Sequence, residues 1–356
     1  MNSINNYNNF LESPIPVIEQ NWPEGTLPLV SVSSLVYNHI SHLEICIKQL
    51  LKQCTSFPVE FVFHDDASTD GSKAIMQHYV NTYPKLFKLV SQDTNIYHLN
   101  VRKIEDDLHK VRRGKYIANC EGDDYWSDPL KLEKQVAFLE SNPDFSGVHT
   151  KVEYVNAAGE RVGFSNKVPP SLYESDFGNV VLNSMIHSVS FMYRSEVLTI
   201  ENKFIWELTN HYYDQYLFLA TSLHGKIKYL NEVTAVYRVN VGVLNTWNRF
   251  SKARYTEECL HFFQSRISRD DWSLALCTKL KSVYAILYCC HAKSNDNYAN
   301  DYLIKYVKNY ANLYRLLPFF KFLRLVFSFD YNFIRGLFWH IVIFLSRGRI
   351  LPKGIT

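Results

Sequence analysis

The sequence predicts an α/β domain: a mainly parallel sheet with flanking helices. Apolar strand-like segments alternate with amphipathic helical segments through the first half of the chain, which is the pattern of parallel sheets. Acidic clusters follow two of the expected strands. In open α/β sheets the carboxyl ends of the strands face the ligand crevice, so these acids are candidates for a functional site.

Local patterns place the first elements. Strands are expected at 29–37, 59–63, 86–90 and 116–119, where β-branched and apolar residues cluster. A helix is expected from Ser41, because Ser41 and Glu44 have the spacing of a capping box. A second helix is expected at 73–80.

After the fourth strand the pattern continues and then changes. Asp128 suits a helix cap and Pro129 a first helical position. Further strands are expected at 148–155 and 188–193, a helix from 212, and a closing strand pair at 226–230 and 233–238. From about Asn248 only helices are expected, at 250–267, 271–290 and 300–316. We therefore divide the chain into a lead (1–27), an α/β domain (28–247) and a helical region (248–356).

Composition excludes several classes of protein. The 356 residues carry a net charge of +3, which is too balanced to indicate a nucleic-acid partner. The seven cysteines include no CxxC pair, so reduced thiols in a cytosolic compartment are expected. The first ten residues do not resemble a secretory signal. No apolar run reaches the roughly 20 residues of a spanning helix.

The block Glu121-Gly122-Asp123-Asp124 follows the strand at 116–119 directly. Paired acids at such a strand end suit a divalent cation that holds a phosphate. Asx residues also favour turns and caps, and we assign Asp128 and Pro129 to that structural role. The turn reading does not explain Glu121, Asp123 and Asp124 together, so these three are expected to be functional.

A second acidic pair, Asp65-Asp66, follows the strand at 59–63. Loops that follow parallel strands meet at one sheet edge, so this pair could approach Asp123 and Asp124. A turn is the alternative reading, and it is preferred for Asp70 and Gly71.

With these segments in order, the chain resembles the family 2 glycosyltransferases of the GT-A fold over roughly residues 28–245. The resemblance depends on the strand ending in Tyr37-Asn38-His39, on Asp65-Asp66-Ala67-Ser68-Thr69-Asp70-Gly71-Ser72 and on the Glu-Gly-Asp-Asp-Tyr-Trp block. It is similar to the bacterial subgroup that acts on surface polysaccharides.

The resemblance implies roles for the nucleotide side. Tyr37 matches the aromatic residue that lies against the base. Asp66 matches the acceptor for the uracil N3–H, which a carboxylate can accept, and Asp65 supports it.

It also implies a metal and a base. One acid of Glu121-Gly122-Asp123-Asp124 contacts the ribose, with Glu121 and Asp123 on the nucleotide sugar, and Asp123 or Asp124 holds Mg²⁺ or Mn²⁺ on the diphosphate. Asp214 matches the catalytic base, which takes the proton of the acceptor hydroxyl. Without the resemblance, Asp214 is only an acid near a helix start.

Three positions depart from the family pattern: Val36 replaces a common threonine, Glu121 replaces an aspartate, and Asn240 stands where many relatives have histidine.

Several other histidine and aromatic residues are interpreted as structural. His39, His64 and His149 are interpreted as ordinary polar or core residues. Tyr125 and Trp126 are expected to pack the crevice wall, and Trp126 could also contact the sugar.

The last fifty or so residues are basic and aromatic. Nine basic residues face one acid, Asp330, and phenylalanines are interleaved with them. The basic residues are Lys305, Lys308, Arg315, Lys321, Arg324, Arg335, Arg347, Arg349 and Lys353. Basic amphipathic helices lie in membrane interfaces, so we expect a peripheral membrane anchor. The alternative is a helical cap that packs on the α/β domain.

The sequence therefore predicts a metal-dependent, inverting glycosyltransferase, a hexosyltransferase that moves a sugar from a UDP-sugar to a lipid-linked or polysaccharide acceptor. It would be cytoplasmic and peripheral on the inner face of a bacterial membrane. The alternatives are a nucleotide-sugar-binding or assembly protein without catalysis, and a sugar nucleotidyltransferase, whose glycine-rich phosphate loop is missing from the N-terminal part of the sequence.

Overall fold

The computed structural model describes residues 10–97, 99–183, 185–198, 213–241, 248–267 and 270–294. The chain divides into two compact units, Met1–Leu276 and Cys277–Thr356. The sheet and the pocket described below belong to the first. The predicted division between an α/β domain and a helical region near Asn248 stays a prediction.

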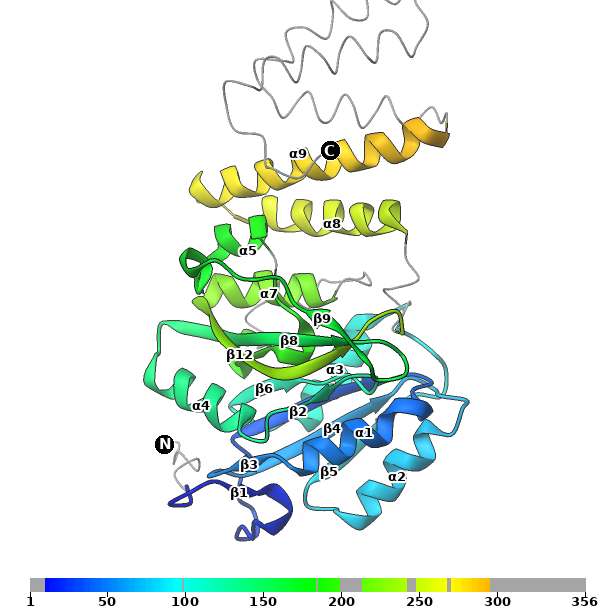
Figure 1. Ribbon diagram of the computed structural model, residues 1–356, viewed down its shortest axis with the longest axis vertical. Helices are drawn as coiled ribbons and strands as arrows, with labels where there is room; N and C mark the ends of the chain where they lie inside the picture. Colours follow the sequence, from blue (N-terminus) through cyan, green and yellow to red (C-terminus); the bar gives the residue numbers. More distant parts are fainter. Residues whose placement is uncertain are drawn as a thin grey trace, which may run out of the picture. The chain divides into compact units, whose positions relative to one another are not determined.

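The first unit is built on a sheet of ten strands within the described residues (Figure 1). Its main path runs in the order β10 (Glu174–Ser175), β12 (Lys226–Arg238), β8 (Phe145–Val155), β11 (Met192–Arg194), β6 (Tyr116–Asn119), β2 (Val30–Val36), β4 (Val59–Asp65) and β5 (Phe87–Ser91). Off this path β7 (Tyr125–Trp126) pairs with β12, and β9 (Arg161–Phe164) pairs with β8. A separate small sheet joins β1 (Ile15–Pro16) to β3 (Cys54–Thr55).

Helices connect the strands or follow the last one. Among the described residues they are, in chain order, α1 (Ile40–Leu51), α2 (Ser72–Thr82), α3 (Val101–Val111), α4 (Lys131–Ser141), α5 (Phe177–Asn183), α7 (Tyr213–His224), α8 (Arg249–Gln264) and α9 (Asp270–Ser294). Short 3-10 helices lie at η1 (Val17–Glu19), η2 (Pro170–Leu172), η3 (Ser188–Ser190) and η4 (Ser195–Leu198).

The sheet is mixed, so the expectation of a mainly parallel sheet is correct for one half only. β6, β2, β4 and β5 are parallel, as predicted. β11 lies antiparallel between β6 and β8, and β8 pairs with β12 in parallel. The pairing of β11 links segments more than forty residues apart, and local periodicity carries no information about it.

Two predicted elements are wrong in detail, and one helix was not predicted. The segment 188–193 is not one strand, because η3 occupies its first three residues and β11 begins at Met192. The expected strand pair at 226–238 is one strand, β12, with irregular register between Leu230 and Val233. The helix α3 was not predicted. The expected helix at 300–316 and the basic tail lie outside the described residues.

Two of the helices bury leucine and isoleucine side chains that recur at helical spacing. Leu43, Ile47 and Leu50 of α1 are fully buried, and so are Leu132 and Leu139 of α4. Burying such side chains stabilises the fold by roughly 1.5–3 kcal/mol each. The two helices therefore pack on the sheet and fix the loops that precede them.

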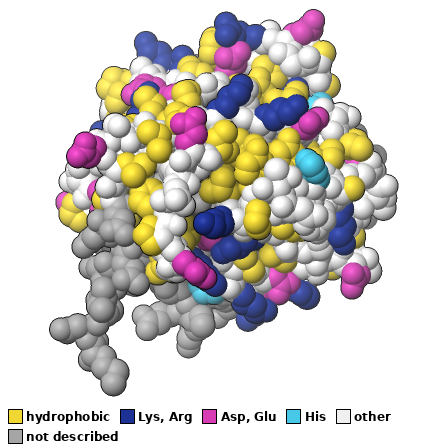
Figure 2. Space-filling view, turned by 90° about the horizontal axis from the view of Figure 1, so that it is seen from below, with side chains coloured by type: hydrophobic (Ala, Val, Ile, Leu, Met, Phe, Trp, Pro, Cys, Tyr) yellow, Lys and Arg dark blue, Asp and Glu magenta, His cyan; other side chains and the backbone are white. Residues whose placement is uncertain are grey.

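The face of the molecule seen in Figure 2 mixes side-chain types. Basic and acidic side chains are interspersed there among apolar ones (Figure 2). Single exposed apolar side chains such as Phe10 and Ile18 are ordinary on soluble surfaces. A search of the described helices found no segment with the length and hydropathy of a membrane span.

Candidate functional site

The carboxyl ends of β2, β4 and β6 meet at one pocket of about 310 Å³. Six of the predicted site residues line it: Tyr37, Asp66, Glu121, Asp123, Asp124 and Asp214. Asp65 does not line the pocket. The structure thus brings together acids from three separate stretches of sequence. Asp66 and the acidic block follow the parallel strands β4 and β6, as expected, whereas Asp214 comes from α7.

The loops after β2 and β4 are held together by Asp70. Its two carboxylate oxygens accept hydrogen bonds from the backbone N–H of Ile40 at the start of α1 and from that of Ser72 at the start of α2, each at 2.9 Å. The predicted capping box at Ser41 is therefore wrong, because α1 begins at Ile40 and a residue thirty positions away supplies its cap. The structural reading of Asp70 is confirmed.

Asp65 and Asp66 have different structural roles. Asp65 is fully buried, and its Oδ1 accepts a hydrogen bond from the Ser68 backbone N–H at 3.1 Å. Asp66 lines the pocket, and its two oxygens accept from the backbone N–H groups of Ile96 and Tyr97 at 2.9 and 3.0 Å. Asp66 therefore fixes the loop before α3, which contributes Tyr97 to the same pocket.

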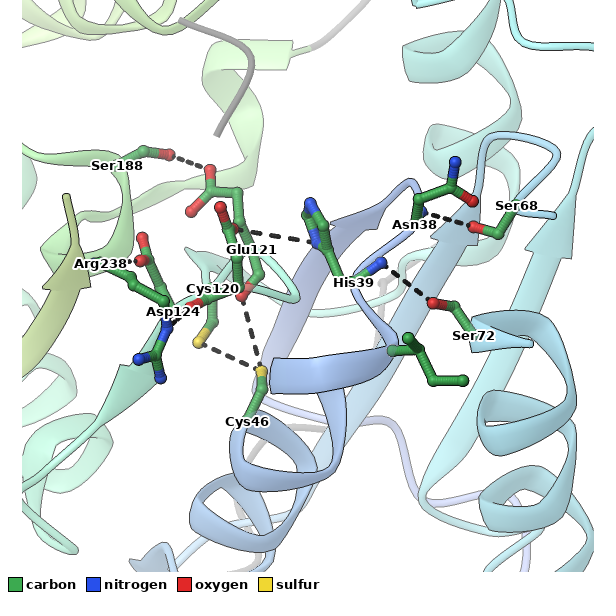
Figure 3. Close-up of polar contacts among 12 residues, drawn as sticks. Asn38, His39, Cys46, Ser68, Ser72, Cys120, Glu121, Asp124, Ser188 and Arg238 are labelled. Carbon is green, nitrogen blue, oxygen red and sulfur yellow. Dashed lines mark hydrogen bonds and ion pairs between the residues drawn. The ribbon is translucent and has the colours of Figure 1, made fainter. Parts of the chain in front are cut away.

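Gly122 lets the acidic block pack against β2. A Cβ at this position would lie 2.9 Å from His39 Nδ1 and 3.0 Å from Val36 Cγ2. From the other side, Cys46 of α1 donates to the Glu121 carbonyl at 3.6 Å and lies 3.8 Å from Cys120 (Figure 3). The backbone of the block is thus clamped between β2 and α1.

Asp123 and Asp124 have different surroundings. Asp124 Oδ1 accepts a hydrogen bond from the Arg238 backbone N–H at 2.7 Å, and the Arg238 Nε donates to the Asp123 carbonyl (Figure 3). The Asp123 carboxylate has His39 Nδ1 as a neighbour, at 3.9 Å. Burial and the charges of Asp123 and Glu121 raise the pKa of Asp124 well above its usual range.

Glu121 is the acid of this block that contacts Ser188 of η3. Its Oε1 accepts from the Ser188 hydroxyl at 2.6 Å, and its Oε2 is buried without a hydrogen-bond partner among the described residues. Burial raises the pKa of Glu121 to about 8, and the negative charge of Asp214 is the second-largest cause of this increase. Glu121 and Asp214 both line the pocket.

Asp214 stands in the first turn of α7, where the sequence predicted a helix start, and it lines the pocket. Burial raises the pKa of Asp214 to about 6; a hydrogen bond with Ser188 acts in the opposite direction, and the charge of Glu105 adds to the increase. A carboxylate with a pKa near neutrality is suited to general-base work.

The donor set fits a divalent cation that takes most of its ligands from a bound phosphate. Within the described residues no group of three or more His, Cys, Asp or Glu side chains forms a metal site by itself. Mg²⁺ is often held by one or two carboxylates, with phosphates and water completing the shell. The carboxylates of Asp123 and Asp124, which both line the pocket, provide such oxygens.

Some residues that line the pocket were not among the predicted site residues. Ser188 and His187 line the pocket at η3, and Asn95 lines it beside Tyr97. No pattern in the sequence marks these residues, because their approach depends on the position of β11 and on the loop held by Asp66. His39 and His64, interpreted as ordinary polar residues, also line the pocket.

Other assignments concern residues away from the pocket. Trp126 is buried in the core and donates its Nε1–H to the Val189 carbonyl at 2.8 Å, so it does not line the pocket. Asp128 accepts from the Leu130 backbone N–H, but α4 begins at Lys131, so Pro129 is not its first residue. Asn240 follows β12 with φ +62° and does not line the pocket.

Comparison with known proteins identifies the matched region. Residues 31–199 match the model described as "Glycosyl transferase family 2". The protein Rv1520 of Mycobacterium tuberculosis, named as uncharacterized, is 32% identical over 221 residues, which cover 59% of this chain and 58% of that protein. EpsE of Bacillus subtilis, named as a glycosyltransferase, is 35% identical over 137 residues, covering 38% of this chain and 46% of EpsE. The chain thus spans less than two thirds of these relatives.

Solved structures share the fold. Residues 1–349 of TarS from S. aureus, in complex with UDP-GlcNAc, superpose with a TM-score of 0.51 at 19% identity over 81% of this chain and 90% of that one. The mannosyltransferase PcManGT of Pyrobaculum calidifontis, in complex with GDP-Man and Mn²⁺, gives a TM-score of 0.52 at 16% identity over 86% and 87%. Residues 31–199 therefore match glycosyl transferase family 2, and the chain has the GT-A fold.

Proposed function

We propose that this chain is a metal-dependent, inverting glycosyltransferase that moves a sugar from a UDP-sugar to a lipid-linked or polysaccharide acceptor in the synthesis of a bacterial surface glycan. One observation carries the proposal. A single pocket contains the nucleotide-side residues Tyr37 and Asp66, the acids Glu121 and Asp123, and the base candidate Asp214.

The nucleotide binds at the β2 and β4 side in this proposal. Tyr37 is 39% exposed, which leaves its ring available to lie against a base. Each Asp66 oxygen accepts one backbone N–H and retains a second lone pair for the uracil N3–H. The complex of TarS with UDP-GlcNAc and that of PcManGT with GDP-Man and Mn²⁺ support a nucleotide-sugar donor.

Asp123 is our choice for the main metal ligand, with Glu121 on the ribose. Asp124 has one oxygen committed to the Arg238 backbone, so it supports the loop and leaves coordination to its neighbour. When bound, Mg²⁺ or Mn²⁺ supplies charge neutralisation on the departing diphosphate.

Asp214 serves as the base. The acceptor oxygen bonds to the anomeric carbon from the side opposite the UDP, its proton passes to the Asp214 carboxylate, and the bond between the anomeric carbon and the diphosphate oxygen breaks. This displacement inverts the configuration at the anomeric carbon. General-base catalysis of this kind contributes roughly 10²–10⁴-fold to the rate.

We place the enzyme on the cytoplasmic face of the membrane. The support is the sequence of the tail, where basic and aromatic residues alternate as in interfacial helices. Anionic lipid and the basic residues attract each other, and this attraction would hold the enzyme beside a lipid-linked acceptor.

A donor panel tests the proposal. UDP-Glc, UDP-Gal, UDP-GlcNAc, UDP-GalNAc and GDP-Man are each scored with Mn²⁺ by thermal shift, since a ligand of the folded state raises its stability. The same mixtures are assayed for release of free sugar and nucleotide. Release of UDP from one donor supports a transferase. Binding without release would identify a nucleotide-sugar-binding protein, and release of pyrophosphate from a sugar phosphate and UTP would identify a nucleotidyltransferase.

A further inference from the structure

Ser188 lies between the donor-side acid and the base. Its hydroxyl donates to Glu121 Oε1 at 2.6 Å (Figure 3). Ser188 and Asp214 line the same pocket, and a hydrogen bond with Ser188 lowers the pKa of Asp214. The Asn119 side-chain amide donates to the Ser188 hydroxyl oxygen at 3.3 Å. Ser188 belongs to η3, Glu121 follows β6 and Asp214 stands in α7, so one hydroxyl connects three separate elements of the fold.

The single proton of the Ser188 hydroxyl cannot be donated to both acids at once. Serine has one O–H donor and two acceptor lone pairs. With the Asn119 amide on one lone pair, the proton is donated either to Glu121 or to Asp214. A ligand group that takes the place of Ser188 on Glu121 therefore leaves the proton for Asp214.

We propose that Ser188 is a positioning residue for the transfer reaction: it orients the Asp214 carboxylate toward the acceptor and couples it to occupancy of Glu121 by the donor. This inference rests on the proposed function. Before the donor binds, the hydroxyl donates to Glu121. When a donor ribose hydroxyl replaces it there, the serine proton turns to Asp214 and holds that carboxylate ionised and in place. The base is then fully oriented only when the donor is present.

Ser190 provides a matched control in the same 3-10 helix. Its hydroxyl donates to the His187 backbone carbonyl at 2.9 Å, and the residue is fully buried. Ser190 therefore secures the turn itself, whereas Ser188 lines the pocket. Removing each hydroxyl separates the effect of the turn from the effect on the base.

The experiment uses the full chain with Ser188→Ala, Ser188→Thr, Ser190→Ala and Asp214→Asn. The substrate is the donor with the highest turnover in the panel above, and kcat, KM and UDP affinity are measured. For Ser188→Ala we expect kcat to fall roughly 10- to 100-fold, as for a lost hydrogen bond to a charged group, with UDP affinity changed less than about threefold. Ser188→Thr should recover most of kcat, and Ser190→Ala should behave as the wild type. In the Asp214→Asn background Ser188→Ala should have little further effect, because a residue that acts through the base is then redundant.

Three results would overturn the inference. They are a kcat of Ser188→Ala within about twofold of wild type, an equal loss of UDP affinity, and full additivity with Asp214→Asn. A wild-type chain that turns over no donor would refute the proposed function instead. In that case the thermal midpoints of Ser188→Ala, Asp214→Asn and the double variant still test the interaction between Ser188 and Asp214. Shifts in midpoint that do not add in the double variant support the interaction, and shifts that add reject it.

Discussion

The Arg238 backbone N–H donates to Asp124 Oδ1 at 2.7 Å, and the two residues are 114 positions apart in the chain. This bond fastens the end of β12 to the acidic loop after β6. Because the Arg238 side chain also donates to the Asp123 carbonyl, the loop is held at both residues. Asp123 can therefore point a carboxylate into the pocket without having to stabilise the loop.

The two neighbouring acids should respond differently to substitution. Asp123→Asn should abolish the Mn²⁺-dependent part of UDP affinity and leave the thermal midpoint unchanged. Asp124→Ala should instead lower the free energy of unfolding by about 1–3 kcal/mol, because it leaves the buried Arg238 N–H without its acceptor. UDP titration with Mn²⁺ or EDTA and chemical denaturation measure the two effects. Unchanged Mn²⁺ dependence in Asp123→Asn would contradict the metal assignment.

Removal of the base should affect chemistry rather than binding. Asp214→Asn should reduce kcat roughly 10²–10⁴-fold with UDP affinity unchanged, since a proton acceptor acts only in the chemical step. Asp106→Asn, at a partly exposed acid of α3 that pairs with Arg102, controls for the loss of a charge. A parallel loss of UDP affinity would mean that Asp214 belongs to the donor site.

Turnover should depend on pH through the same residue. The pKa of Asp214 is raised by burial to about 6, and the base works only when it is ionised. We therefore expect kcat to be full well above pH 6 and to fall as the pH drops through 6. The residual kcat of Asp214→Asn should lack this step. A profile for the wild type that stays flat from pH 5 to 7, or the same step in Asp214→Asn, would assign the base elsewhere.

The sequence predicted the half of the site that local patterns determine. Strand ends and the acids that follow them are adjacent in the chain, so the convergence of Asp66 and Asp123 followed from parallel topology alone. The contact of Ser188 with Glu121 could not be predicted, because Ser188 reaches Glu121 only when β11 pairs antiparallel with β6 and β8. The cap of α1 was misassigned for a similar reason: Asp70 acts across two loops, whereas the capping-box rule considers only neighbours within a turn.

Asp70 should matter for stability more than for chemistry. Asp70→Ala removes the acceptor for the first N–H groups of both α1 and α2, and loss of a helix cap costs about 0.5–2 kcal/mol. We expect a loss in the free energy of unfolding at the upper end of this range, measured by urea denaturation. Asp93→Ala, at an exposed loop acid, is the control. Equal stability of the two variants would show that water replaces the cap without cost.

The tail should bind membranes through charge. In the full chain, replacing Lys321, Arg324 and Arg335 by glutamine should weaken binding to liposomes that contain anionic lipid, because each basic residue near such a surface contributes about 1 kcal/mol. Binding by the unaltered chain should also weaken as salt rises, since the Debye length falls from about 10 Å at 0.1 M to 3 Å at 1 M.

The control for the tail replaces three exposed lysines outside it, Lys48, Lys85 and Lys110, by glutamine. This variant carries the same change in net charge, so it should bind liposomes as the unaltered chain does if the tail is the anchor. Donor hydrolysis in solution should be equal in all three proteins, because an anchor does not take part in chemistry. Liposome binding that is equally weak in both variants would assign the attraction to overall charge. Loss of hydrolysis in the tail variant alone would favour a helical cap that packs on the α/β domain, and the membrane role would then be abandoned.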